Sequence, residues 1–191
     1  MTDLWPVAGT LLLSGDGVVL REWADADRPA MIALFDEPSI DRWTPLESPF
    51  DQDAAGRYLA RAAQRRRQGT ALQLVITEDG RAPLGEVLLF DHGESDGGDR
   101  VGEVGYSLGL SHRGRGLATR AVRLLADHAC AHWRFRLLRL RIESGNVASE
   151  RVGHRCGFLL TPAGPLHLES KGRSIELRTW ERTFRAPRDP A

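Results

Sequence analysis

The chain has 191 residues, of which 41% are hydrophobic and 27% are charged, and its 26 basic and 26 acidic side chains cancel. This length and composition fit one globular domain over residues 1–191, with an ordered core at about 10–185 and a short tail at each end. Zero net charge argues against a general nucleic-acid binder and against a membrane-surface binder, because both partners attract a basic excess.

The first half of the chain predicts one strand, two helices and a strand pair. In chain order, the expected elements are a strand at 18–23, a helix at 25–35, a helix from Asp51 or Asp53 to Gly69, and strands at 71–77 and 84–90. Pro38 is expected to stop the first helix, because proline has no N–H to continue the hydrogen-bond ladder.

The second half predicts a long helix between strands. The expected elements are an acidic, glycine-rich loop at 91–100, a strand at 101–108, a helix at about 114–133, a strand at 138–142, a short helix from Asn146 or Ser149 to Gly157, and strands at 158–160 and 174–180 joined by a loop at 162–173. Apolar residues of the long helix recur at i, i+4, i+7 and i+8. The order β-α-α-β-β-β-α-β-α-β-β predicts a mixed α/β layer.

Residues 105–119 (GYSLGLSHRGRGLAT) hold the most informative pattern, a strand end, a polar loop and a helix start. The first N–H groups of a helix have no internal partner, and the helix dipole adds partial positive charge there. Gly114 and Gly116 let the backbone approach a bulky anion, and Arg113 and Arg115 add charged donors. The segment predicts a pyrophosphate cradle; the alternative is a turn that binds nothing. Neither the Walker motif nor the dinucleotide fingerprint is present here.

Arg113-x-x-Gly116-x-Ala118 resembles the Arg/Gln-x-x-Gly-x-Gly/Ala signature of the GNAT acetyltransferases. Three further blocks, at 19–27, 102–106 and 146–158, resemble the branch of ribosomal-protein N-terminal (alanine/serine) acetyltransferases, so that the resemblance spans about residues 17–183. It implies the GNAT fold, an α/β (α+β) architecture whose central mixed, mostly antiparallel sheet of about seven strands is flanked by about four helices.

The same resemblance implies an acyltransferase that moves an acetyl group from acetyl-CoA to a primary amine, by direct transfer in a ternary complex. The acceptor would be a protein N-terminus or a small-molecule amine. A non-catalytic acyl-CoA-binding or regulatory domain is the alternative. Relatives in this branch are often dimers, which leaves a homodimer open.

Site residues follow from the resemblance. The residues expected to hold the pyrophosphate are Arg113, Gly114, Arg115, Gly116, Leu117, Ala118 and Thr119. Ser107 and Leu108 would offer backbone groups to the pantetheine arm, and a backbone N–H there would face the developing oxyanion. Asn146 would bond the same arm or cap the following helix.

Two residues are candidates for proton transfer. Glu103 is the candidate base, with an exposed strand residue as the alternative reading. An α-amine has an ordinary pKa of about 7.7–8.0 and lysine about 10.4, so an α-amine loses its proton more readily. The tyrosine that many relatives use to protonate the leaving thiolate has no counterpart after Asn146, and Ser149 is the nearest hydroxyl. Ser149 is therefore the candidate acid, or else a helix cap.

Other patterns in the chain do not predict a site of their own. His128 and His132 have zinc-ligand spacing, but no second pair stands at a suitable distance, so we expect no metal. A covalent route through Cys156 lacks an activating base. The arginine run 65–67 is typical of a solvated helix face. Trp43 is expected either in the acceptor cleft or in the core.

The chain also predicts its compartment. Two cysteines in a chain of this length make a poor disulfide framework, which favours a reducing environment. The apolar run 11–13 is too short for a signal peptide, and no stretch approaches the ~20 apolar residues of a spanning helix. We therefore expect a cytoplasmic protein.

Overall fold

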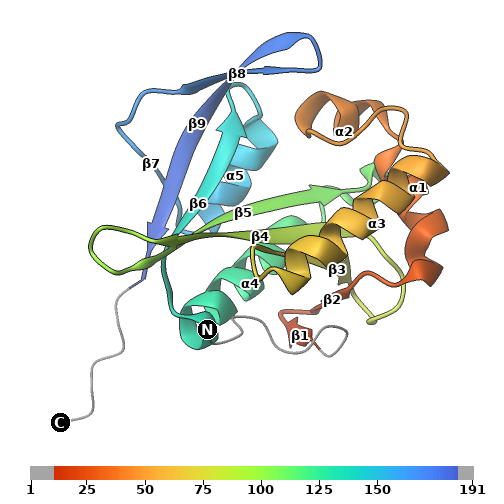
Figure 1. Ribbon diagram of the computed structural model, residues 1–191, viewed down its shortest axis with the longest axis horizontal. Helices are drawn as coiled ribbons and strands as arrows, with labels where there is room; N and C mark the ends of the chain where they lie inside the picture. Colours follow the sequence, from red (N-terminus) through yellow and green to blue (C-terminus); the bar gives the residue numbers. More distant parts are fainter. Residues whose placement is uncertain (1–10, 185–191) are drawn as a thin grey trace.

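The computed structural model describes residues 11–184, which form one mixed sheet with helices on both faces (Figure 1). The strands are β1 (Leu12–Gly15), β2 (Val18–Glu22), β3 (Ala71–Thr77), β4 (Gly85–Glu94), β5 (Arg100–Leu108), β6 (Phe135–Glu143), β7 (Leu159–Leu160), β8 (Leu166–Ser170) and β9 (Arg173–Thr183). Their order is β1-β2-β3-β4-β5-β6-β9-β7, with β8 also paired to β9. All pairs are antiparallel except β5 with β6.

The helices divide between the two faces of the sheet. They are η1 (Asp25–Asp27), α1 (Arg28–Phe35), α2 (Pro38–Trp43), α3 (Gln52–Arg67), η2 (Leu110–His112), α4 (Leu117–Trp133) and α5 (Val147–Arg155). Figure 1 shows α3 crossing one face of β3 and β4, with α4 and α5 on the opposite side. No helix within residues 11–184 is long and apolar enough to cross a membrane.

Alternation along the strands builds a separate apolar cluster on each side. On the α4 side, Leu74 and Val87 pack with the buried helix residues Leu117 and Leu125. On the other side, an aromatic group joins α1 to α3, with the ring of Phe35 edge-on to those of Phe50 and Tyr58. The sheet residues Gln73 and Glu86 point to this second side, where Tyr58 bonds both.

The expected α/β architecture with a mixed, mostly antiparallel sheet is confirmed, but within the described residues 11–184 the number of strands is nine rather than about seven. The strand β1 is missing from the prediction because it is short and buries only Leu13. The strand β8 lies in the expected loop 162–173, which instead forms a hairpin whose turn uses positive φ at Lys171 and Gly172. The expected loop 91–100 is also shorter than predicted, with half of its residues in strands, since β4 runs to Glu94 and β5 begins at Arg100.

Two helix boundaries also differ from the prediction, and the described part of the chain contains five α-helices rather than about four. The first helix, α1, ends at Phe35, before Pro38. Pro38 itself begins α2, since a proline at the first position of a helix loses no hydrogen bond. The helix α4 begins at Leu117 rather than Gly114, because Gly114 and Gly116 have φ of 77° and 75°, outside the helical region.

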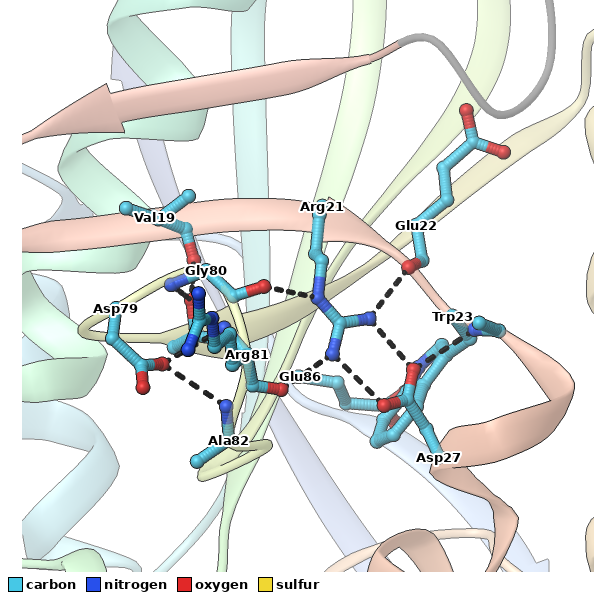
Figure 2. Close-up of polar contacts among 12 residues, drawn as sticks. Val19, Arg21, Glu22, Trp23, Asp27, Asp79, Gly80, Arg81, Ala82 and Glu86 are labelled. Carbon is cyan, nitrogen blue, oxygen red and sulfur yellow. Dashed lines mark hydrogen bonds and ion pairs between the residues drawn. The ribbon is translucent and has the colours of Figure 1, made fainter.

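Arg21 on β2 ties the start of the chain to the turn between β3 and β4 (Figure 2). All five of its N–H donors are used. Its Nε bonds the Gly80 carbonyl at 2.8 Å, its two terminal nitrogens bond the Asp27 carboxylate at 2.6 and 2.8 Å, and the remaining donors bond the carbonyls of Glu22 and Arg81. Burial alone would raise the pKa of Asp27, but the bonds from Arg21 and the Ala24 N–H lower it below its ordinary value.

Candidate active site

The site begins where two parallel strands separate. β5 and β6 pair from Arg100 opposite Phe135 as far as Glu103 opposite Arg139, and no pair follows. β5 nevertheless continues to Leu108 and β6 to Glu143, where β6 is paired only with β9. Backbone groups on the facing edges of both strands are therefore not used by each other, and an opening results between the strand ends.

A cavity of about 310 Å³ lies at this opening. Its wall combines the end of β5, the loop before α4, the first turn of α4, the first two turns of α5 and one side of α2. The lining residues include Tyr106, Ser107, Leu108, Arg113, Gly114, Gly116, Leu117, Ala118, Thr119, Asn146 and Ser149, with Ser39, Ile40 and Trp43 from α2. Ten of the twelve residues expected in the site from sequence are thus brought together, and Glu103 and Arg115 are not among the lining residues.

The loop before α4 has the form of an anion cradle. Gly116 is the N-cap of α4 in the left-handed region, and no side chain caps the helix. A side chain at Gly114 or Gly116 would meet no atom within 4 Å, so both positions face open space. The first N–H groups of α4, from Leu117 to Thr119, have no partner within the helix. Geometry and dipole together suit a phosphate or diphosphate group.

The two arginines of this loop are bound to the protein itself. Arg113 donates from Nε and Nη2 to the carbonyl of Leu108 at 3.0 and 2.9 Å, and Nη2 also pairs with Glu37 at 2.8 Å. Arg115 pairs with Glu78 at 2.6 Å. Arg113 therefore fixes the loop against the end of β5, and backbone amides provide most of the cradle.

Two guanidinium groups besides that of Arg113 lie in the cavity wall. Arg151 and Arg155 of α5 both line the cavity, and neither forms an ion pair with any residue in the described range 11–184. Their charge is available to an anionic ligand. The sequence signal for this pair was the spacing i, i+4 on a short helix, which alone does not separate a binding face from a solvated one.

Asn146 and Ser149 form the start of α5. The Asn146 side chain accepts a bond from the Ser149 N–H at 3.1 Å, which makes Asn146 the helix cap. Tyr106 on β5 reaches the same turn, with its hydroxyl 3.4 Å from the Ser149 carbonyl. Burial raises the pKa of Tyr106 to about 12, so the phenol stays protonated. Tyr106 was not predicted as a site residue, although it adjoins Ser107 where the strand leaves its partner.

Ser107 is the most unusual polar residue in the wall. It is 7% exposed, and its hydroxyl has no hydrogen-bond partner. Buried hydroxyls are nearly always bonded, so an unpaired one beside a cavity indicates a position for a ligand. Gly85 on β4 lies opposite the end of β5. It lets the two strands approach closely at Ser107, because a Cβ at position 85 would lie 2.2 Å from the Ser107 carbonyl oxygen.

The candidate base Glu103 lies elsewhere on the strand. Its carboxylate is 3.0 Å from Nε of Arg141 and 3.5 Å from Nε2 of His92. Glu103 and Ser107 share a face of β5 but are four residues apart, which is roughly 13 Å along a strand. Trp43, by contrast, lines the cavity and is 38% exposed, with the Arg42 guanidinium 4.0 Å from its ring. Of the two expected positions for Trp43, the structure supports the cleft.

Within residues 11–184, no group of three or more His, Cys, Asp or Glu side chains is placed to hold a metal ion. His128 and His132 stack with ring centroids 4.3 Å apart.

The family model of the acetyltransferase (GNAT) domain matches residues 18–159 of this chain. The chain belongs to the GNAT family. It is an acyltransferase, and its architecture is the GNAT fold. A comparison with curated protein sequences gave no match.

Solved structures of GNAT proteins resemble this one closely in fold. Mycobacterium smegmatis RimJ in complex with CoA-disulfide is 23% identical with a TM-score of 0.75, covering 91% of this chain and 86% of that one. The Salmonella typhimurium acetyltransferase that modifies the N-terminal serine of ribosomal protein L7/L12 is 16% identical with a TM-score of 0.78 and coverage of 92% and 100%. The microcin C7 self-immunity acetyltransferase MccE, in complex with acetyl-CoA and AMP, is 17% identical with a TM-score of 0.76 and coverage of 96% and 100%.

Proposed function

We propose that this GNAT protein acetylates a primary amine, using acetyl-CoA as the acetyl donor in a ternary complex. The observation that carries the proposal is that the end of β5, beyond the point where β5 separates from β6, lines the same cavity as the uncapped start of α4. Two of the structural neighbours were solved with CoA or acetyl-CoA, in agreement with such a site.

The residues present fit this donor. The N–H groups from Leu117 to Thr119 and the glycines before them would hold the pyrophosphate, and Arg151 and Arg155 would face its other phosphate oxygens. The edge of β5 at Ser107 and Leu108 would bond the amide groups of the pantetheine arm. Acetyl-CoA supplies the activated acetyl thioester.

The state of Cys156 supports direct transfer rather than a covalent intermediate on that thiol. Burial raises the pKa of the Cys156 thiol to about 11, and its sulfur bonds the Thr119 carbonyl at 3.4 Å. A thiol in that state is a poor nucleophile at neutral pH. Ser149, at the turn facing Tyr106, is the proposed donor of a proton to the leaving thiolate.

The acceptor amine would enter along α2, where Ser39, Ile40 and Trp43 line the cavity. We propose a protein N-terminal α-amine or a small amine of similar basicity. The neighbour that modifies an N-terminal serine is a precedent for the first. The low ordinary pKa of an α-amine also favours it, since more of it is unprotonated at neutral pH.

The test is release of free thiol from acetyl-CoA in the presence of ribosomal-protein N-terminal peptides and simple amines, with mass spectrometry of the acceptor. An acetylated amine with a matching amount of thiol supports the proposal. Tight binding of acetyl-CoA without turnover on any amine would instead identify a non-catalytic acyl-CoA-binding domain.

A further inference from the structure

One buried carboxylate lies beside this site without a charged partner. Glu86 on β4 is 3% exposed, and it forms no ion pair with any of residues 11–184. A buried carboxylate without a countercharge is costly, and such groups cluster at functional sites.

The bonds to Glu86 leave one side of the carboxyl group unused. Tyr58 donates to its Oε2 at 2.6 Å and Trp23 to the same oxygen at 3.3 Å; Trp23 and Glu86 are both labelled in Figure 2. Gln73 donates in turn to the Tyr58 hydroxyl at 2.8 Å. Among the described residues, no donor bonds Oε1. The group is therefore held in place by neutral donors while retaining an oxygen that can accept a proton.

The register of the sheet joins this carboxylate to the cavity. Glu86 is directly opposite Ser107 in the antiparallel pair of β4 and β5. Directly opposite residues have Cβ atoms about 5 Å apart and point to the same face. Ser107 lines the cavity, and its hydroxyl lacks a partner. A change of Ser107 rotamer or one bridging water would connect the two groups.

We propose that Glu86 is the proton acceptor for the amine substrate and that the Ser107 hydroxyl relays the proton to it. This inference rests on the proposed function and names a positioning residue for the same reaction. Glu86 acts through Ser107, and Ser107 is the group that touches the substrate.

The three protons of the substrate ammonium group are all accounted for in this reaction. The bound ammonium gives one proton to Ser107 Oγ while the Ser107 hydroxyl proton passes to Glu86. The amine nitrogen then bonds the thioester carbonyl carbon, the carbon–sulfur bond breaks, and a second nitrogen proton ends on the leaving sulfur. The third hydrogen remains as the amide N–H. Glu86 returns its proton to solvent before the next turnover.

The side chains around Glu86 agree with a titration near neutral pH. Burial raises the pKa of Glu86 to about 7, with the bonds from Tyr58 and Trp23 acting in the opposite direction. Burial and the Glu86 charge raise the pKa of Tyr58, so its hydroxyl remains a donor, and Arg65 of α3 acts on Tyr58 in the opposite sense. Gln73 on β3 and Ser107 on β5 are neutral. A base with a pKa near the working pH is the most effective one.

The substrate class follows from the same chemistry. Proton transfer from an α-ammonium, with a pKa of about 7.7–8.0, to such a carboxylate is nearly balanced, whereas transfer from a lysine ammonium at about 10.4 is strongly uphill. The relay therefore favours α-amines and other weakly basic amines.

The test compares Glu86→Gln and Ser107→Ala with wild type across pH 6–9, using an N-terminal peptide and acetyl-CoA. Gln keeps an oxygen for Tyr58 and Trp23, and Ala removes a hydroxyl that has no partner, so both variants should fold. At pH 7 each variant should lose about tenfold in kcat/KM for an α-amine, because only its unprotonated fraction can react, and more for stronger bases. Raising the pH to 9 should restore most of the loss. The matched control is Glu94→Gln, at the exposed end of the same strand.

Each outcome decides the matter. Wild-type rates in Glu86→Gln at pH 7, or a loss that persists at pH 9, would overturn the relay while leaving acetyl transfer intact. A loss in Glu86→Gln without one in Ser107→Ala would overturn the relay through Ser107. If wild type acetylates no amine, the proposed function fails instead. The titration of Glu86 is then read without turnover, from the pH dependence of folding stability, and a Glu86 that does not titrate near pH 7 refutes the inference by itself.

Discussion

Replacing Glu86 by Gln should change how the stability of this protein depends on pH. The carboxyl group has an ordinary pKa of 4.5. In the folded protein this pKa is raised to about 7, mainly because burial removes water from the charged form. The hydrogen bonds from Tyr58 and Trp23 reduce this rise but do not cancel it. The native state therefore binds a proton at this position more tightly than the unfolded chain does.

The magnitude and the sign follow from linkage. At about 1.36 kcal/mol for each pKa unit, the difference amounts to about 3 kcal/mol. Because the folded-state pKa is raised, this stabilisation is fully present below pH 4.5 and is lost as the pH rises through 7. Glu86→Gln has no such loss. The variant should match wild type near pH 4.5 and exceed it by up to about 3 kcal/mol at pH 8.

The assay is urea-induced unfolding followed by far-ultraviolet circular dichroism at pH 5, 6, 7 and 8, with Glu94→Gln as the matched control. Other carboxylates change the absolute curves, but they cancel in the difference between variant and wild type. The prediction is refuted if the difference between Glu86→Gln and wild type does not change between pH 5 and pH 8. That result would mean that Glu86 is either charged or neutral throughout this range.

Three further substitutions test the frame of the site. Arg21→Lys should destabilise the protein by about 2–4 kcal/mol in urea unfolding, since the three donors of an ammonium group cannot replace the five bonds of Arg21, including those to Asp27. A change under 1 kcal/mol would contradict the network in Figure 2. Gly116→Glu should bind CoA at least about tenfold more weakly than Gly116→Gln, which shares the backbone strain but not the charge, as measured by calorimetry. Equal affinities would refute the interpretation of this loop as an anion cradle. Gly85→Ala should lower thermal stability by about 2–3 kcal/mol, because its Cβ would lie 2.2 Å from the Ser107 carbonyl oxygen; an unchanged melting temperature would show that β4 and β5 can separate there.

The sequence was sufficient for the parts of the fold that follow from local patterns. The long helix α4 has apolar residues at helical spacing, and β3 and β6 have strand-like alternation, so their positions were predictable to within a few residues. The strands β1 and β8 were not, because β1 buries one side chain and all of β8 but its last residue is exposed. Each of these strands instead forms because the next strand along the chain, joined to it by a two-residue turn, offers unpaired backbone groups.

The part of the site that lies in one short segment was predictable from the sequence. The residues from Arg113 to Thr119 are contiguous, so their pattern could be read directly, although the actual contacts of Arg113 and Arg115 with Glu37 and Glu78 could not. Trp43 was expected in the acceptor cleft or in the core, but the helix α2 that positions it was missed, because Pro38 was interpreted only as the end of a helix. A proline can equally begin one, and here it does.

The choice of a base shows why register matters more than spacing along the chain. Glu103 is four residues from Ser107 in sequence, but along an extended strand this is roughly 13 Å, and Arg141 and His92 contact its carboxylate. Glu86 is 21 positions away from Ser107 in the chain but directly opposite it in the sheet. No periodicity could reveal that pairing, because it depends on how the segment between β4 and β5 turns. The carboxylate that we propose as the proton acceptor is therefore one whose position opposite Ser107 only the folded structure could reveal.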